Sequence, residues 1–239
     1  MPVAPVLPLA ALILLGLAAC STQLGKNGQP TTTVDLKYLA KTEVDRIADL
    51  NRQELVSGLM MLADKLYRRN PREWKKAGHP SREAALERLN RRQAPLWPEL
   101  TGLREGPAAA LAFSDSYGGD RVAALVYGLL TMVDAAFEHK ESFYLFDQLD
   151  ERKLYNCARN VEVAVWKLAH DRSAAGEAFL LANELDPANR NLSFEREFGR
   201  LIGLLDFLAR VVADRNGRSF SRLTQNVATM IFLPVGLLK

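Results

Sequence analysis

The sequence contains few of the residues that most often carry chemistry in proteins. Only two of its 239 residues are cysteines and only three are histidines. Cys20 lies in the N-terminal apolar region, so Cys157 has no partner for a disulfide in the rest of the chain and packing must supply the stability. The net charge of +3 is too small to argue for nucleic-acid binding, and we expect no nucleic-acid partner.

No catalytic motif compensates for this scarcity. The sequence has no Gly-x-Ser-x-Gly elbow and no Walker loop, and none of His79, His139 and His170 stands in the His-Glu-x-x-His spacing of zinc hydrolases. Cys157 lies in the middle of a predicted helix, where free cysteines usually behave as small buried hydrophobic residues. We therefore expect a protein that acts by binding rather than by catalysis, without a cofactor.

One small cluster is compatible with a metal ion. Asp134 and Glu138 are four residues apart and would share one face of a predicted helix, with His139 beside them. They could bind a cation, or they could be the solvated acidic end of an otherwise buried helix. No second carboxylate–histidine pair is present to complete a di-metal site, which favours the second interpretation. A metal-dependent hydrolase centred on these three residues is accordingly the least favoured function.

The N-terminal region carries the most informative pattern in the sequence. An apolar stretch begins near Val6 and ends in the run Leu17-Ala18-Ala19-Cys20. A short apolar region that ends in small residues is typical of a cleaved export signal, because it is too short to span a bilayer stably. Cys20 stands where cleavage would leave it as the first residue of the mature chain.

This segment resembles the signal of bacterial lipoproteins, whose lipobox consists of a leucine, two small residues and an obligatory cysteine. The resemblance implies that the thiol of Cys20 is diacylglycerated, that the chain is cut before it and that the new amine is acylated. Three acyl chains would attach the protein to a membrane essentially permanently. Ser21 follows the cysteine, where an aspartate tends to retain Gram-negative lipoproteins in the inner membrane. The resemblance therefore implies an outer-membrane protein that faces the periplasm.

The composition divides the chain into three parts. We assign residues 1–19 to the signal peptide, residues 20–33 to the lipid anchor and a flexible tether, and residues 34–239 to a helical periplasmic domain. The tether is rich in Gly, Asn, Thr and Pro and has little to bury. An apolar content of 48% and a charged content of 25% are ordinary for a globular domain with its own core.

The spacing of apolar residues predicts an all-α fold. Apolar residues recur at three-, four- and seven-residue steps, and no segment shows the alternation of a strand bounded by hairpin turns. Capping residues such as Ser81, Asp120 and Asp150, and the breaker Asn70-Pro71, divide the pattern into about seven to nine helices. We expect a single multi-helix bundle, orthogonal or up-down, with no sheet. The predicted helices run from about Thr42 to Asn70, from Ser81, from Pro107, from Asp120 to Phe137, from Asp150 to Leu168, from Asp171 or Ser173 to Leu185, from Ser193 to Asn216, and from Ser219 to Pro234.

Two segments in the C-terminal third allow more than one interpretation. Ala175, Phe179, Ala182 and Pro187 have the spacing of the second helix of a tetratricopeptide repeat, a resemblance that covers about a dozen residues and lacks the first helix. Two packed helices with coincident small and aromatic positions explain the spacing more simply. Residues 230–238 are unusually apolar for a chain end, so we expect a strap over the core; the alternative is an exposed patch that docks a partner or the membrane.

Charge is distributed unevenly along the chain. Ten basic and three acidic residues lie between Lys65 and Arg92, whereas six acidic residues and one lysine lie between Asp134 and Glu151. A basic surface with interleaved aromatic residues could bind an envelope protein, anionic lipid headgroups or lipopolysaccharide phosphates. It could equally be a solvated helix end whose arginines pair with the acidic stretch. The candidate contact residues are Lys65, Arg68, Arg69, Arg72, Trp74, Lys75, Lys76, Arg88, Arg91 and Arg92.

Together these patterns predict an outer-membrane lipoprotein with a non-catalytic helical domain, an interaction or scaffold module in cell-envelope assembly or maintenance. Its partners would be the membrane, through lipidated Cys20, and an envelope protein or anionic lipid, through the basic surface. The alternative is a lipid- or small-ligand-binding protein with a cavity between the apolar helices at Val122–Phe137 and Val161–Leu168. A continuous cavity would favour the ligand-binding protein, and a filled core would favour the scaffold.

Overall fold

The computed structural model contains a helical unit and a short N-terminal strand pair. The chain divides into two compact units, residues 1–42 and residues 43–239, which we describe separately. In the first unit, β1 (Gln23–Leu24) pairs antiparallel with β2 (Pro30–Thr31), a ladder of only two residue pairs. The structure describes residues 23–24, 30–31, 41–91, 100, 102–184, 186–217 and 231–238.

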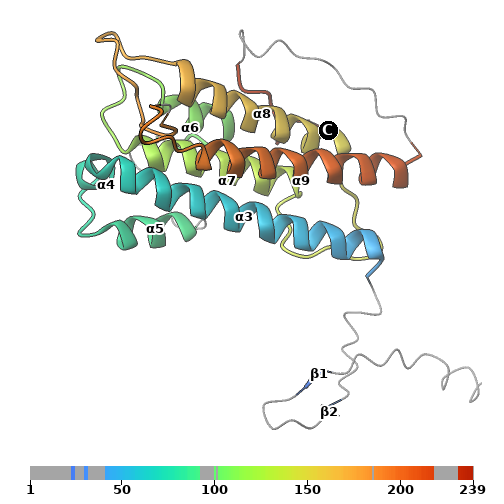
Figure 1. The fold of residues 1–239 in the computed structure, drawn as a ribbon. Coiled ribbons are helices and arrows are strands. Elements are labelled where there is room, and N and C mark those ends of the chain that lie inside the picture. Colours follow the sequence, from blue (N-terminus) through green and yellow to red (C-terminus); the bar gives the residue numbers. More distant parts are fainter. Residues whose placement is uncertain are drawn as a thin grey trace, which may run out of the picture. The chain divides into compact units, whose positions relative to one another are not determined.

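The second unit is an all-α bundle, as predicted. Its described residues form seven helices and no strand, which is the lower end of the predicted count. Each of the four long helices packs against two others, so that they form a ring in chain order (Figure 1). The long helices are α3 (Glu43–Arg69), α7 (Arg121–Ala136), α8 (Glu151–His170) and α9 (Ser193–Arg215).

Neighbouring helices in this ring run antiparallel, so the bundle is of the up-down type. Tyr67 near the end of α3 hydrogen-bonds Asp120 just before α7, and Arg215 at the end of α9 pairs with Asp45 at the beginning of α3. The beginning of α8 contacts the residues that follow α7 and α9, so these two pairs of helices are antiparallel as well. We call the end at which the chain enters α3 the proximal end and the opposite end the distal end.

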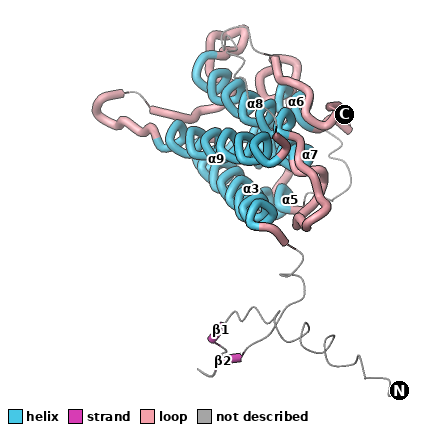
Figure 2. Tube along the Cα trace, turned by 90° about the vertical axis from the view of Figure 1, so that its right-hand side faces the viewer, coloured by secondary structure: helices cyan, strands magenta, loops and turns pink. Residues whose placement is uncertain are grey.

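Three short helices complete the unit. α4 (Pro71–Lys76) and α5 (Arg82–Asn90) pack against α3 and α7 at the distal end, and Figure 2 shows α5 beside α3. α6 (Glu105–Leu111) lies against α7. Gly128 of α7 permits this close approach, because a Cβ atom there would lie 2.5 Å from the backbone nitrogen of Ala109 in α6.

Helix boundaries follow the capping residues of the sequence. Ser81, Asp120 and Asp150 each accept a hydrogen bond from a backbone N–H in the first turn of the helix that they precede. Gly217 follows α9 with a φ of 64°, the left-handed conformation expected of a glycine that ends a helix. The prediction that Ser193 caps α9 is wrong, since Ser193 is the first residue of the helix and Leu192 occupies the cap position.

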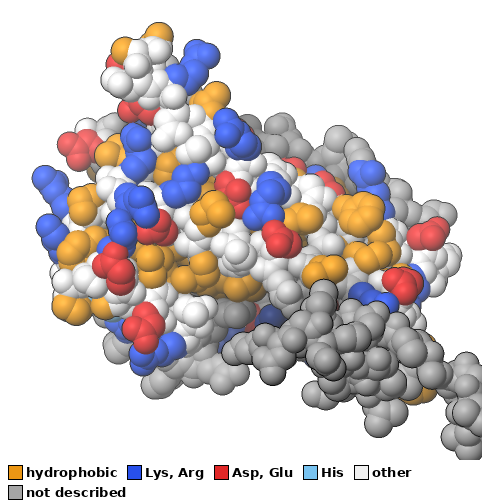
Figure 3. Space-filling model, turned by 60° about the horizontal axis from the view of Figure 1, so that its bottom comes forward, with side chains coloured by type: hydrophobic (Ala, Val, Ile, Leu, Met, Phe, Trp, Pro, Cys, Tyr) orange, Lys and Arg blue, Asp and Glu red, His pale blue; other side chains and the backbone are white. Residues whose placement is uncertain are grey.

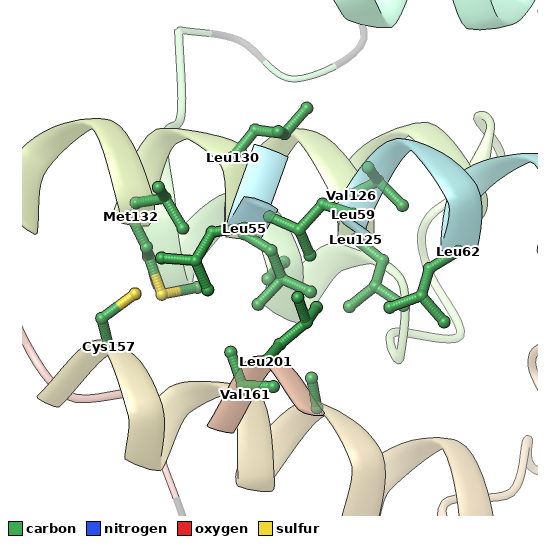
Figure 4. Close-up of a cluster of buried hydrophobic side chains, with 14 of the residues drawn as sticks. Leu55, Leu59, Leu62, Leu125, Val126, Leu130, Met132, Cys157, Val161 and Leu201 are labelled. Carbon is green, nitrogen blue, oxygen red and sulfur yellow. The ribbon is translucent and has the colours of Figure 1, made fainter. Parts of the chain in front are cut away.

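Helix α7 lies at the centre of the core. Fourteen of its sixteen residues are buried, so other elements cover it on every side. Figure 4 shows Leu55 and Leu59 of α3 near Leu125 of α7, with Val161 of α8 and Leu201 of α9 in the same cluster. Within the described residues, no helix combines the length and the apolar character that a membrane span requires.

The described C-terminal residues, 231–238, form a strap over the core as predicted, although Ile231 and Leu237 are exposed. Val235 is fully buried, and Phe232 packs partly buried beside Gly106 of α6. Asn160 of α8 is also fully buried; its Oδ1 accepts a hydrogen bond from the backbone N of Leu233 at 2.6 Å, and its Nδ2 donates to the carbonyl oxygen of Leu233 at 2.8 Å. One amide side chain thus holds both backbone groups of a strap residue.

The segment between α8 and α9 is not helical, which contradicts the prediction. Residues 171–184 and 186–192 form turns with two isolated bridges, and Leu180 and Ala182 are buried at alternate positions, as in an extended chain. Asn70 accepts a hydrogen bond from the backbone N of Leu181 at 2.8 Å and donates to its carbonyl oxygen at 2.9 Å. Ser, Asn and Asp side chains within the segment also accept backbone hydrogen bonds, which stabilises turns instead of a helix.

This correction removes the basis of the tetratricopeptide resemblance, because its residues do not form a helix. The last predicted helix, from Ser219 to Pro234, lies mostly outside the described residues, and its described end, residues 231–234, is not helical.

Candidate functional site

The predicted basic surface lies at the distal end of the helical unit. Its residues come from the last turns of α3 and from α4 and α5, and Arg92 lies outside the described residues. In Figure 3, Lys and Arg side chains gather toward the left-hand end, where Figure 1 places α4 and α5, but acidic side chains lie among them. The structure therefore brings the predicted residues together without making an unbroken positive patch.

Several of these basic residues form ion pairs at the same end of the unit. Their carboxylate partners come from α3, α4, α5 and the segment that follows α8, and none of these partners belongs to the acidic stretch 134–151. The interpretation that the arginines pair with that stretch is therefore wrong for these residues. The pairs are Arg68 with Asp64 at 2.8 Å, Lys76 with Glu73 at 2.8 Å, Arg69 with Glu184 at 3.4 Å, and Arg91 with Glu87.

Lys65 has a structural role. Its Nζ donates a hydrogen bond to the carbonyl oxygen of Ser193 at 2.9 Å and lies 4.7 Å from the centre of the Phe194 ring. Burial lowers the pKa of this lysine. Lys65 therefore joins α3 to the beginning of α9 and is not a free surface cation.

Arg72 and Lys75 differ from the other exposed members of the basic surface. Both are exposed on α4, and neither forms an ion pair with a carboxylate in the described part of the chain. The Nζ of Lys75 lies 5.3 Å from the ring centre of the half-buried Trp74, and Arg88 is half-buried on α5. Arg72, Trp74 and Lys75 together make the distal contact surface, the name used below.

A buried polar cluster lies beneath the distal contact surface at the beginning of α7. The Tyr67 hydroxyl donates a hydrogen bond to Asp120 Oδ2 at 2.8 Å, and Glu73 Oε2 accepts one from the backbone N of Arg121 at 2.9 Å. Burial raises the pKa of Asp120 to about 6 and also raises the pKa of Tyr67. Because both carboxylates bind N–H groups of the first turn of α7, the cluster joins α3 and α4 to α7.

The three metal candidates do not converge on one point. α7 ends before Glu138, and Glu138 and His139 adopt left-handed conformations with φ values of 54° and 57°, so the predicted common helix face does not exist. Asp134 Oδ2 lies 2.7 Å from Nδ1 of His139, whereas Glu138 points to Lys153 at 2.8 Å. In the described residues no group of three or more His, Cys, Asp or Glu side chains is placed to hold a metal ion.

Cys157 is a buried residue of the core, as expected. Burial raises the pKa of its thiol to about 12, and Figure 4 shows it beside Met132 of α7. A thiol with so high a pKa is almost wholly protonated at neutral pH and is a poor nucleophile. The position of Cys157 is therefore that of a packing residue.

Two depressions lined by described residues lie at the proximal end. One has a volume of about 10 Å³, barely enough to admit a single water molecule, and lies between the start of α3 and the end of α9. The other is an open depression of about 520 Å³ with charged residues such as Glu138, Arg152 and Lys153 in its lining. Neither is lined by Val122–Phe137 or Val161–Leu168, the helices between which the alternative function needs its cavity.

The connection between α7 and α8 contains exposed apolar residues that the sequence analysis missed. Phe146 is 92% exposed and Leu145 is 51% exposed, while nearby Phe143 is buried. We name Leu145 and Phe146 the apolar tip. The sequence pattern that could have predicted the tip is the run of four apolar or aromatic residues from Phe143 to Phe146 within an otherwise acidic stretch.

The chain has no match among protein-family models, curated proteins or solved structures. Cys20 and the signal-like residues 1–19 lie outside the described residues, so the lipoprotein prediction depends on the sequence alone.

Proposed function

We propose that the protein is a lipoprotein, anchored to an outer membrane through acylated Cys20, and that its helical unit acts by binding an envelope partner. The observation that carries this proposal is the run Leu17-Ala18-Ala19-Cys20 at the end of a short apolar stretch. A cysteine that receives more than one acyl chain is held firmly at a membrane. Ser21 in the next position favours the outer membrane over the inner membrane.

The construction of the helical unit supports a role in binding. Long irregular segments are fixed to helices by Asn70 and Asn160, and polar groups such as the half-buried Lys65 and the buried Asp120 join helices to one another. A unit held in one shape presents its surface groups in a constant arrangement, which lowers the entropic cost of binding a partner. This rigidity suits a scaffold or an interaction module.

The distal contact surface is the best candidate for the partner-binding face. Arg72 and Lys75 extend from α4 without described ion-pair partners, and Trp74 provides an aromatic surface beside them. Helix α3 has 27 residues, so this surface lies about 40 Å along the helix from the point where the chain enters the unit. Basic side chains beside an aromatic ring suit a periplasmic protein with an acidic surface.

Fractionation of cells that express the full chain tests the anchor. We expect the wild type to sediment with outer membranes and the Cys20→Ala variant to be uncleaved or released. A Cys20→Ala variant that is processed and sediments like the wild type would contradict the proposal.

Site-specific photo-cross-linking from position 72 tests the binding face. We expect a discrete adduct that is lost when Lys75 is changed to Glu and is retained when Arg46, at the proximal end, is changed to Glu. An adduct that survives Lys75→Glu, or that forms equally from position 46, would exclude the distal contact surface.

A further inference from the structure

We infer that the apolar tip, Leu145 and Phe146, is a second membrane contact that inserts into the lipid interface and orients the helical unit on the membrane that holds Cys20. This inference rests on the proposed lipid anchor and adds to it the part of the folded unit that touches the bilayer. The occupant that we assign to the tip is the interfacial region of a phospholipid bilayer.

The backbone that carries the tip is well held. Phe143 is buried, with its ring 6.0 Å from that of Phe137, and its backbone N donates a hydrogen bond to Asp49 Oδ1 of α3 at 2.8 Å. Asp147 accepts a hydrogen bond from the backbone N of Tyr144 at 2.9 Å and is also bound by Lys140. The exposure of the tip is therefore a feature of a fixed loop and not of a loose one.

The tip presents two adjacent apolar side chains to the solvent. Phe146 is 92% exposed and Leu145 is 51% exposed, although the segment that carries them has buried neighbours on both sides, Phe143 and Leu149. Leu237, 86% exposed, precedes Leu238, which lines the open depression together with Gln148 and Leu149 at the same end. Phenylalanine and leucine are among the residues with which peripheral proteins enter a bilayer interface.

The position of the tip identifies the membrane as its occupant. Arg215 donates a hydrogen bond to the carbonyl oxygen of Leu145 and forms an ion pair with Asp45 in the first turn of α3. The α7–α8 connection thus lies against the beginning of α3, as Figure 1 shows with the yellow loop beside the blue start of that helix. Only 22 residues, 21–42, separate this point from Cys20, so an acylated Cys20 keeps the bilayer within reach and even a weak contact is populated.

The charged residues near the tip are of both signs and offset one another. Insertion would therefore be driven by the apolar side chains and not by electrostatic attraction. Lys140, Arg152 and Arg215 lie at the proximal end, but so do Asp147 and Asp150. We therefore expect insertion of the tip to depend little on ionic strength or on anionic lipid. Binding through the distal contact surface, which is basic, would instead weaken with salt.

Quenching of tryptophan emission by lipids brominated on their acyl chains tests the inference. The full acylated chain is reconstituted into phosphatidylcholine vesicles with and without the brominated lipid, as the wild type and as two variants. Phe146→Trp reports on the tip, and Leu181→Trp, at an exposed apolar residue of the distal end, is the matched control. The native tryptophans are common to all three proteins, so subtraction of the wild type isolates the added emission.

We expect loss of the added emission of Phe146→Trp in brominated vesicles, unchanged at high salt, and no loss for Leu181→Trp. Three results overturn the inference: no quenching of Phe146→Trp, equal quenching of both variants, or quenching that requires anionic lipid. Intact mass of the same sample separates failure of the anchor from failure of the tip. If Cys20 proves unmodified, the proposed anchor is wrong. The tip is then tested by the same quenching experiment at a higher vesicle concentration. Lack of quenching of Phe146→Trp under those conditions again overturns the inference.

Discussion

Asparagine side chains fasten the irregular segments of this protein to its helices. Asn70 and Asn160 each bind both the backbone N–H and the carbonyl oxygen of one residue, Leu181 and Leu233 respectively. An amide offers one donor and one acceptor in the arrangement that a neighbouring strand would provide. The two residues therefore replace a sheet partner in an all-helical fold.

Asn160→Ala should release the C-terminal strap. The substitution leaves both backbone groups of Leu233 without their partner in a partly buried site, so we expect a loss of about 1–3 kcal/mol in the free energy of unfolding. Urea unfolding measures this loss, and hydrogen exchange should show faster exchange in residues 231–238. Asn156→Ala, which removes one exposed hydrogen bond to Pro234, is the control. A loss no larger than that of the control would contradict the assignment.

Asp120 should give the protein a pH-dependent stability. Burial raises its pKa from 3.8 to about 6, so the folded state holds the proton more tightly than the unfolded state. The stability from this group is complete below about pH 4 and is lost as the pH rises through 6, by up to about 3 kcal/mol. Asp120→Asn keeps a good helix cap without the titration. We expect the free energy of unfolding of the wild type to fall relative to that of the variant between pH 4 and 7; parallel curves would show that Asp120 does not titrate in this range.

At the scale of helices, packing distances decide where a side chain is tolerated. Gly128 and Gly199 both lie within long helices, but a Cβ at Gly128 would meet the α6 backbone at 2.5 Å, whereas one at Gly199 has no atom within 4 Å. Gly128→Ala should therefore cost about 1–3 kcal/mol or more through overpacking. Gly199→Ala should stabilise the protein by about 0.5–1 kcal/mol through helix propensity. Thermal or urea unfolding of the two variants measures both effects, and a shift of the same sign in both would contradict this packing.

Helices with local signals could be predicted from the sequence, and elements made by distant contacts could not. α5, α7 and α8 begin after Ser81, Asp120 and Asp150, because each of these residues caps the helix that directly follows it. The sequence from Asp171 to Leu185 has helical spacing, yet Asn70, more than a hundred residues away in sequence, binds both backbone groups of Leu181, which a helix would use internally. Periodicity within a segment carries no information about such a partner.

At the scale of the whole molecule, the two ends of the bundle differ. The distal end carries the basic residues of α4 and α5, and the proximal end carries the apolar tip and the acidic stretch 134–151. The clustering of basic residues could be predicted, because they are close in sequence. The ion pair of Arg69 could not, since its carboxylate partner, Glu184, comes from beyond α8, and a count of charges does not reveal such a partner.

Charge reversal of the distal contact surface should leave the fold intact. Arg72 and Lys75 are exposed and have no ion-pair partner among the described residues, so Arg72→Glu with Lys75→Glu should change the free energy of unfolding by less than about 0.5 kcal/mol. Urea unfolding measures the change. A loss of several times this size would mean that these residues support the fold, and the variant could not then be used to test binding.

Intact mass spectrometry of the mature full-length protein tests the central claim, that Cys20 anchors the helical unit to a membrane. We predict a chain that begins at Cys20 and carries the added mass of acyl chains, together with a Cys20→Ala variant that carries none. A mature chain that retains residues 1–19, or that contains an unmodified Cys20, would contradict the claim and leave the helical unit without its proposed attachment.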